Sequence, residues 1–342
     1  MFLWPQFCFS SLGVFFLAMA EMKPLPSLLD HTLQLRWSLP VLAFLLALPF
    51  VTQAFGDTFY VGLATRVLVF ALAATSLNLI LGFGGMVSFG HAAFLGIGAY
   101  SVAILMQNGI ASAWIAWPLA ILLTALVSML IGWISLRTQG VYFIMITLAF
   151  AQMLYYLVIS LKSYGGDNGL SLAARSRAGW GIDLSNDAHL YYASLAVLVL
   201  ALFLMMRLLN ARFGHVLQAI RLNEVRMVAL GYRVFRYKLT AFAIAGAVAG
   251  LAGVLLANVG GFVSPAMMQW SQSGMLMMMV ILGGVGHIYG GVIGAIVFLL
   301  LEEFLSLYTI HWQLGLGAVL LIVVLFAPNG ITSLLKRKVG HD

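Results

Sequence analysis

Apolar residues dominate most of the chain in runs of about 20, and short polar segments separate these runs. A run of that length, folded as a helix, crosses the ~30 Å hydrocarbon layer of a membrane. The pattern therefore predicts an all-α polytopic membrane protein with about ten transmembrane helices. The predicted spans are residues 37–55, 59–81, 86–106, 114–136, 140–160, 189–207, 239–259, 274–288, 290–308 and 312–328.

These spans divide the chain into three parts. Residues 37–335 form a predicted transmembrane domain, and residues 336–342 form a tail. Residues 1–36 are open to two interpretations: the apolar run over residues 12–20 suits an extra span, whereas a true start at Met22 would make residues 1–21 a spurious extension. A cleaved signal peptide is disfavoured, because no basic leader precedes the apolar run.

Charge supports the same class and predicts an orientation. Only 8% of the 342 residues are charged, whereas soluble domains reach about a quarter, and the net charge is +7. With the first segment inside, basic residues gather on the cytoplasmic side, whereas Lys162, Arg175 and Arg177 fall outside. We therefore expect lipid rather than nucleic acid around the chain, and a cytoplasmic C-terminus. The cytoplasmic set is Lys23, Arg36, Arg137, Arg207, Arg212, Arg221, Arg226, Arg233, Arg236, Lys238, Lys336, Arg337 and Lys338.

The long basic loop over residues 208–238 carries the signals of a short helix. Asn223 suits the N-cap, Glu224 suits the positive end of the helix dipole, and Gly231 suits the left-handed position after a helix. Two turns of helix are unstable alone in water, so this helix needs a surface to pack on. A partner protein is one candidate surface, and anionic lipid is the other.

Glycine is frequent around residues 86–106 and 274–294, and the helices are predicted to be broken there. Asn78, Ser88 and His91 lie beside the first of these segments. Because polar side chains are unfavourable in lipid, these residues should face protein or a water-filled passage. Our hypothesis is that they line a solute path, and interhelical hydrogen bonding is the alternative. Ser88 and His91 are three residues apart and are expected to share a helix face.

Several separated motifs resemble the permeases of bacterial ABC importers for branched-chain amino acids, and more narrowly the M-type permease. The resemblance covers roughly residues 37–335. The motifs are residues 76–82 (SLNLILG), 90–100 (GHAAFLGIGAY), the run 221–238, 239–242 (LTAF), 249–253 (AGLAG), 283–286 (GGVG) and 326–330 (FAPNG).

The resemblance implies a type II-like permease bundle in the bacterial inner membrane. Its partners would be a second homologous permease, two ATP-binding cassette subunits and a periplasmic binding protein. The substrates would be branched-chain amino acids, with urea, short amides or other amino acids as the alternatives. The loop helix would be the coupling helix, which docks on an ATPase subunit. That role carries over onto Arg221, Asn223, Glu224, Arg226, Ala229 and Gly231.

The chain lacks the G-x-x-x-x-G-K-[ST] phosphate loop, so we do not expect it to hydrolyse ATP. We predict no catalytic residue, no metal site and no cofactor. An ion-coupled secondary transporter and a channel are competing classes, whereas a membrane enzyme is disfavoured because no H-E-x-x-H motif occurs.

Two charged positions lie inside or near the spans. Arg66 lies in the second predicted span, where snorkelling outward is the default interpretation and attraction of a substrate carboxylate is the alternative. Glu302 and Glu303 are the acidic residues that come closest to the bilayer, near the outer end of their span. The other acidic residues lie in loops, tails or near span ends, which counts against proton coupling.

Overall fold

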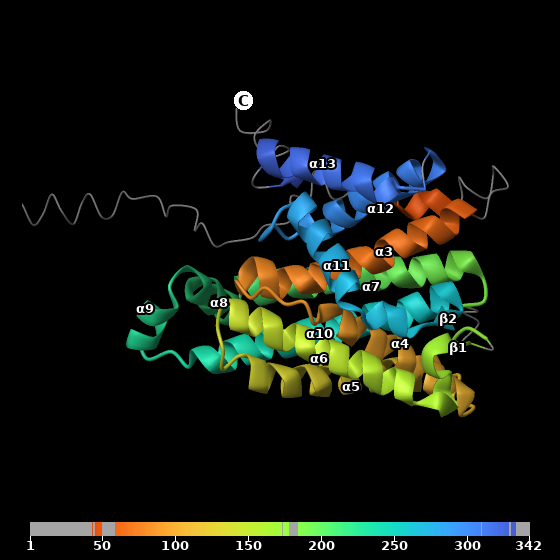
Figure 1. Ribbon diagram of the computed structural model, residues 1–342, viewed down its shortest axis with the longest axis horizontal. Helices are drawn as coiled ribbons and strands as arrows, with labels where there is room; N and C mark the ends of the chain where they lie inside the picture. The colour runs from red at the N-terminus through yellow and green to blue at the C-terminus, as the bar shows by residue number, and fades with distance from the viewer. Residues whose placement is uncertain are drawn as a thin grey trace, which may run out of the picture.

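The computed structural model describes residues 43, 45–49, 59–172, 174–177, 184–308, 310–327 and 330–332. They form a bundle of long helices (Figure 1). The helices are α3 (Phe59–Asn78), α4 (His91–Gln107), α5 (Ala113–Ser135), α6 (Val141–Ser160), α7 (Asp187–Asn210), α8 (Arg212–Leu222), α9 (Glu224–Ala229), α10 (Val234–Gly260), α11 (Trp270–Gly283), α12 (Gly290–Tyr308) and α13 (Trp312–Phe326). The short elements are the π-helix η1 (Leu79–Phe83), the 3-10 helices η2 (Lys162–Tyr164), η3 (Gly166–Asn168) and η4 (Pro265–Met268), and the strands β1 (Leu170–Ser171) and β2 (Phe262–Val263).

The predicted all-α membrane fold is confirmed. Six described helices are long and apolar enough to cross a membrane, and α4, α11 and α13 are shorter apolar helices. Every predicted span from residue 59 onward coincides with a helix, although the ends shift by a few residues. The predicted span 37–55 lies largely outside the described residues, as do the segment 1–36 and the tail 336–342.

The predicted loop 208–238 is shorter than expected. Helix α7 continues to Asn210, and α10 already begins at Val234 rather than at residue 239. The physical reason is that a membrane helix can extend past the apolar layer. Charged residues such as Arg236 and Lys238 therefore occupy the first turns of α10 and do not end it.

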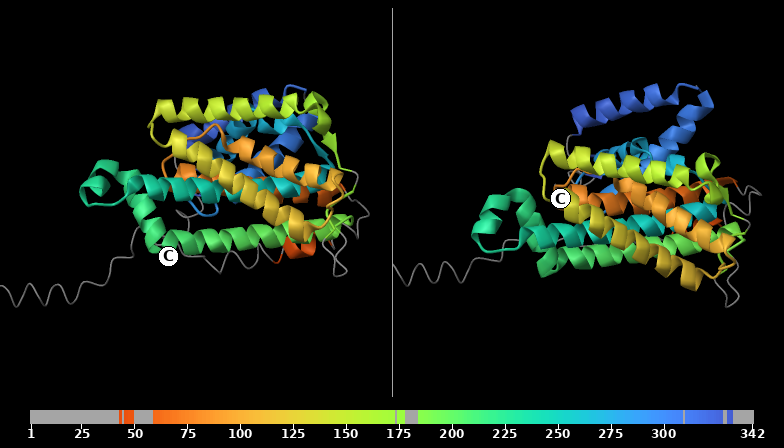
Figure 2. Two further views of the ribbon diagram at one scale, coloured as in Figure 1. Left: turned by 90° about the horizontal axis from the view of Figure 1, so that it is seen from below. Right: turned by 60° about the horizontal axis from the view of Figure 1, so that its bottom comes forward.

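The two ends of the bundle are built differently. The loop end carries α8 and α9, which project beyond the long helices, and the sheet end carries β1 and β2 (Figures 1 and 2). The two strands pair antiparallel, with Leu170 opposite Val263 and Ser171 opposite Phe262. Successive long helices run alternately between these two ends, which is the arrangement expected of a polytopic membrane protein.

Helix α3 is the centre of the bundle. Within its span, 94% of the most apolar stretch is buried, compared with 33% in α5 and 22% in α6. It packs against α7, α10, α11 and α12. Two of its polar side chains form hydrogen bonds within the helix. The hydroxyl of Thr65 donates to the carbonyl of Val61, and that of Thr75 donates to the carbonyl of Ala71, each at 2.7 Å. A uniformly apolar helix surrounded by other helices is typical of the core of a bundle.

Helix α10 lies close to its neighbours because small residues face them. A Cβ placed on Gly246 would lie 2.3 Å from Cβ of Ser128, and one on Gly250 would lie 2.2 Å from Oγ1 of Thr124. These glycines therefore let α10 approach α5 within the same chain. The spacing of four residues between them is an intrachain packing motif.

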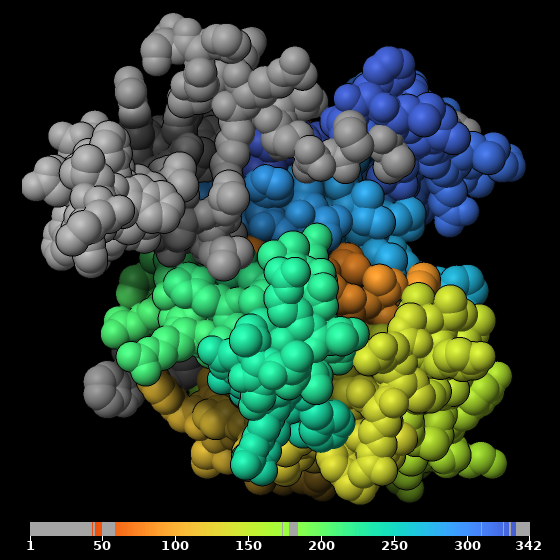
Figure 3. Space-filling model, turned by 90° about the vertical axis from the view of Figure 1, so that its left-hand side faces the viewer, coloured from red at the N-terminus to blue at the C-terminus, as the bar shows by residue number. Residues whose placement is uncertain are grey.

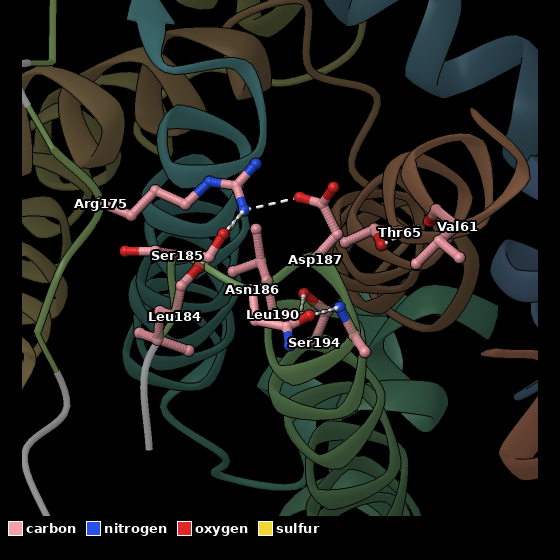
Figure 4. Close-up of polar contacts among 10 residues, drawn as sticks. Val61, Thr65, Arg175, Leu184, Ser185, Asn186, Asp187, Leu190 and Ser194 are labelled. Carbon is pink, nitrogen blue, oxygen red and sulfur yellow. Dashed lines mark hydrogen bonds and ion pairs between the residues drawn. The ribbon is translucent and has the colours of Figure 1, made fainter. Parts of the chain in front are cut away.

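At the sheet end, a cluster of polar contacts ties the long loop to the start of α7 (Figure 4). Arg175 Nη1 donates to Asp187 Oδ1 at 2.6 Å and to the carbonyls of Leu184 and Ser185 at 3.3 and 3.1 Å. Asn186 caps α7 by accepting the N–H of Ala188 at 2.9 Å. The loop is thus closed onto the bundle by satisfied polar groups.

This topology predicts that the two ends face opposite sides of the membrane. In a background without Cys8, the single cysteine of the chain, single cysteines at Ser171 and Arg226 occupy exposed positions at opposite ends. An impermeant maleimide added to intact cells should label Ser171→Cys. It should label Arg226→Cys only after the membrane is opened. Labelling of both positions from the same side would contradict the alternating topology.

Candidate functional site

Two glycine-rich connections between successive long helices meet at the loop end, and we call them the breaks. Helix α3 passes into the π-helix η1, residues 84–90 then run without regular helix, and α4 begins at His91. Residues 284–289 likewise separate α11 from α12. Non-helical glycine-rich segments are therefore present in both predicted regions, but they connect successive helices and do not interrupt α4, α11 or α12, so the prediction of broken helices is wrong in that respect. A π-helical turn leaves backbone groups out of the usual hydrogen-bond register and is often found at functional sites.

Asn78 joins the two breaks. Its Nδ2 donates to the carbonyl of His287 at 2.7 Å, and its Oδ1 accepts the N–H of Gly286 at 3.0 Å. The side chain is 1% exposed, so both ends of the amide are used within the protein. A buried amide that satisfies one donor and one acceptor of a distant segment holds that segment in one register.

Gly82 allows this close approach. A Cβ on Gly82 would lie 2.1 Å from Asn78 Oδ1 and 2.5 Å from the backbone nitrogen of Gly286. Real Cβ atoms do not come this near to such atoms, so any larger residue would push the two breaks apart. We call the assembly of residues 78–90 with residues 283–290 the junction.

Arg221, from the last turn of α8, reaches into the junction. Its Nη1 donates to the carbonyl of Gly82, and its aliphatic stem packs on Gly85, where an added Cβ would lie 2.9 Å from Arg221 Cγ. The carbonyl of Gly82 is one of the groups released where the α3–η1 helix ends. A cytoplasmic-loop candidate from the sequence thus proves to be bonded to the end of a span. On the opposite side, the hydroxyl of Thr332 donates to the carbonyl of Gly283.

Ser88 and His91 lie where the first break meets the start of α4. His91 Nε2 is 2.7 Å from Ser76 Oγ, while its Nδ1 has no hydrogen-bond partner among the described residues. Ser88 Oγ accepts the N–H of Gly90 at 3.2 Å. The expectation that Ser88 and His91 share a helix face is wrong, because α4 begins only at His91 and Ser88 lies in the non-helical break.

Asn78 and His91 therefore make the interhelical hydrogen bonds that were the alternative to lining a path. The lining itself stays a prediction. All three predicted path residues, Asn78, Ser88 and His91, are buried. Asn78 and Ser88 lie within the junction, and His91 directly follows it as the first residue of α4.

The predicted loop helix is present as α9. Asn223 caps it, and its Oδ1 accepts the N–H of Arg226 at 2.9 Å. Gly231 follows the helix with φ +85°, the left-handed conformation expected at this position. Glu224 in the first turn forms an ion pair with Lys238 of α10, with Nζ and Oε2 2.6 Å apart. Glu224 therefore attaches α9 to the start of α10.

The side of α9 that faces away from the bundle is apolar. Met227 is buried in a small cluster with Ile220 and Val234, which holds one side of the helix. The remaining apolar side chains are exposed, as are Arg226 and Ala229. Figure 3 views the molecule from the loop end, where residues 212–233 stand at the front of the space-filling surface. The exposed apolar side chains are Leu222, Val225, Val228 and Leu230, with exposures of 78, 80, 58 and 65%.

Sequence reasoning missed the partners at the junction. Asn78 and Arg221 were both candidates, but nothing in the sequence indicated that they bond to Gly286, His287 and Gly82. The one available signal was that His287 follows a glycine as His91 does. In the described part of the chain, no group of three or more His, Cys, Asp or Glu side chains is placed to hold a metal ion.

Long apolar helices that alternate between two ends, with two connections meeting at a junction beside a projecting loop, are typical of a multi-pass membrane transport protein. The family described as "Branched-chain amino acid transport system / permease component" matches residues 59–325, and the chain belongs to this family. The resemblance drawn from the motifs is thereby confirmed. The family is a membrane transport component and not an ATPase.

Individual relatives agree with this assignment. The chain is 29% identical to the high-affinity branched-chain amino acid transport system permease protein LivM of Salmonella typhimurium over 309 residues, which cover 82% of this chain and 72% of the relative. It is 30% identical to LivM of Escherichia coli K12 over 295 residues, which cover 79% and 69%. It is 25% identical to the permease protein LivH of S. typhimurium over 281 residues, which cover 77% and 90%. No solved structure matches the chain.

The bond from Arg221 to Gly82 can be tested by removing its donor alone. Arg221→Met keeps the apolar stem on Gly85 but leaves the buried Gly82 carbonyl without this donor. Such a loss costs about 1–3 kcal/mol. We expect a lower melting temperature of the purified protein in detergent.

The matched control is Arg212→Met, which removes an exposed guanidinium from the first turn of the same helix. It should melt like the wild type. Equal melting temperatures for Arg221→Met and Arg212→Met would contradict the assigned bond.

Proposed function

We propose that this chain is the M-type permease of an ATP-driven importer. In this proposal it pairs with a second homologous permease, two ATP-binding cassette subunits drive it, and a periplasmic binding protein delivers the solute. The observation that carries the proposal is α9. It offers an exposed apolar face to a partner, and α8 beside it is bonded to the end of the α3–η1 span at Gly82.

The relatives support the second permease. LivM and LivH are named as permease proteins of a high-affinity branched-chain amino acid transport system, and both are similar to this chain. The identity is higher to LivM, at 29–30%, than to LivH, at 25%. We infer that this chain takes the LivM position beside a LivH-like partner.

The exposed face of α9 supports docking on an ATPase subunit. A helix of six residues has little stability of its own. Here the Asn223 cap, the Glu224–Lys238 ion pair and the buried Met227 hold it in place, and Val225 and Val228 are left for a partner. An anionic lipid surface would also accept this combination of arginines and exposed apolar residues, and the substitution of Val225 described below separates the two.

Force on α9 then has a defined route to the solute path. Closure of the ATPase subunits would displace α9 and α8, and Arg221 would carry that displacement to the carbonyl of Gly82. Asn78 links this end of the α3–η1 span to the connection at Gly286, so α3 and the connected helices α11 and α12 would move together. A passage that opens at the junction would be bordered by Asn78, Ser88 and His91.

Basic residues at the loop end support a cytoplasmic position for α8 and α9. Arg207, Arg212, Arg221, Arg226 and Arg233 all lie in or next to these helices. Such a bias is typical of cytoplasmic loops in the bacterial inner membrane. The C-terminal tail follows α13 from the same end and is proposed to be cytoplasmic too.

Branched-chain amino acids are the proposed solutes, and the family description supports this class. Urea, short amides and other amino acids are the alternatives within the same mechanism. Uptake of labelled leucine, compared with labelled urea, by the reconstituted complex with its binding protein separates them.

The docking role predicts a specific effect of charge on the face of α9. Val225 is 80% exposed, so Val225→Asp should fold and insert normally. An aspartate would have to be desolvated at the interface, which is strongly unfavourable. We expect at least a tenfold loss of ATPase subunits that co-purify with the permease, together with loss of ATP-driven uptake.

Ile310→Asp is the matched control, because Ile310 is an equally exposed apolar residue at the sheet end, with 94% exposure. It should keep the ATPase subunits. Wild-type co-purification and uptake with Val225→Asp would mean that α9 is only a lipid-facing connection.

A further inference from the structure

A cavity of about 660 Å³ lies between α3, α11, α12 and α13. Its polar side chains come from the parts of these helices near the sheet end, and they include Arg66, Gln272, Glu302 and Gln313. Deeper walls are apolar and include Phe70 and Phe298. Pockets of about 300–1,000 Å³, mostly apolar with a few convergent polar groups, are typical of small-molecule sites.

The carboxylate in this cavity is incompletely satisfied. Arg66 Nη2 and Glu302 Oε1 are 3.3 Å apart, which makes the ion pair monodentate rather than bidentate. Glu302 Oε2 is buried and has no hydrogen-bond partner among the described residues. The Arg66 side chain is 41% exposed, whereas that of Glu302 is 16% exposed. An arginine–carboxylate pair that served only to hold α3 against α12 would be expected to use both oxygens.

Opposite charges on two facing helices select the chemistry of a ligand. A carboxylate would bind the guanidinium of Arg66, and an ammonium would bind the open oxygen of Glu302. A ligand with only one of these groups would separate the Arg66–Glu302 pair and leave the other protein charge without its partner. A zwitterion satisfies both, and the apolar walls suit an aliphatic side chain.

The cavity lies near the sheet end, where the proposed binding protein would deliver the solute. Arg66 lies seven residues from Phe59, the first residue of α3, which corresponds to about 10 Å along the helix. Glu302 lies six residues from the end of α12 at Tyr308. The two charges are thus near the sheet end and on the opposite side of the bundle from the junction.

We propose that this cavity is the entry site for a zwitterionic aliphatic amino acid, with Arg66 binding its carboxylate and Glu302 its ammonium; the inference rests on the import function proposed above. The amino acid binds before the junction opens. The Arg66–Glu302 contact loosens as the ligand takes its place between the two side chains.

Protection of a cysteine in the cavity wall tests the site without altering its charges. In the full transporter lacking Cys8, Gln272→Cys is treated with a small neutral methanethiosulfonate reagent. Leucine should slow the modification at least threefold. Isocaproate, which lacks the ammonium, and isoamylamine, which lacks the carboxylate, should not. Absence of protection by leucine, or equal protection by either analogue, overturns the proposal.

A lipid headgroup with phosphate and ammonium shares part of this chemistry. The same measurement is therefore made in nanodiscs of phosphatidylglycerol alone and with phosphatidylethanolamine added. Leucine should protect in both. Protection by phosphatidylethanolamine without protection by leucine would assign the cavity to lipid and overturn the proposal.

Substitution of the acidic residue gives an independent test. Glu302→Gln should raise the leucine KM of uptake about tenfold or more. Glu303→Gln, the neighbouring carboxylate outside the cavity lining, should leave the KM unchanged. Equal KM values for the two variants overturn the site. If the wild-type complex itself takes up no leucine under ATP, the proposed function fails, whereas uptake without protection of the cysteine contradicts only the entry site.

Discussion

Backbone groups released by a break in a membrane helix have no water to bond with, so other parts of the protein must satisfy them. This constraint governs the junction. The α3–η1 helix and α11 both end at the loop end, where Arg221 and Thr332 donate to the carbonyls of Gly82 and Gly283. Asn78 bonds the backbone of the connection that follows α11. Removing any one of these side chains would leave an unpaired backbone group, so the breaks and their side-chain partners are a single structural unit.

The same constraint explains how the projecting helices α8 and α9 can affect the junction. Because the donor for the Gly82 carbonyl comes from α8, the end of a central span depends on the position of a helix that lies at the loop end of the bundle. The Glu224–Lys238 ion pair attaches the neighbouring α9 to α10. Movement of α8 would therefore act on the junction through this bond. At the sheet end, by contrast, the polar cluster around Arg175 closes the loop onto α7 and is separate from this linkage.

Sequence reasoning reached the fold class, the positions of the spans, the cap at Asn223 and the left-handed Gly231, because each depends on local pattern. It also selected Asn78 and Arg221. It did not reach their partners, because the contacts of Asn78 with Gly286 and of Arg221 with Gly82 join segments that only the folded bundle brings together. The Arg66–Glu302 ion pair was not predicted for the same reason, because two residues 236 positions apart in the sequence give no local signal of their contact. Ser88 was wrongly placed in the helix with His91, because the apolar pattern does not show that α4 begins only at His91.

The most direct test of the linkage is the reactivity of a cysteine at Val87, a partly exposed position in the first break, in the assembled transporter lacking Cys8. The rate of maleimide modification is compared between the nucleotide-free state and the state trapped with ATP and vanadate. The account predicts that the rate changes between these states in the wild-type background and stays constant in Arg221→Met, with ATPase subunits still bound. A nucleotide-dependent change of equal size in Arg221→Met would contradict transmission through Arg221.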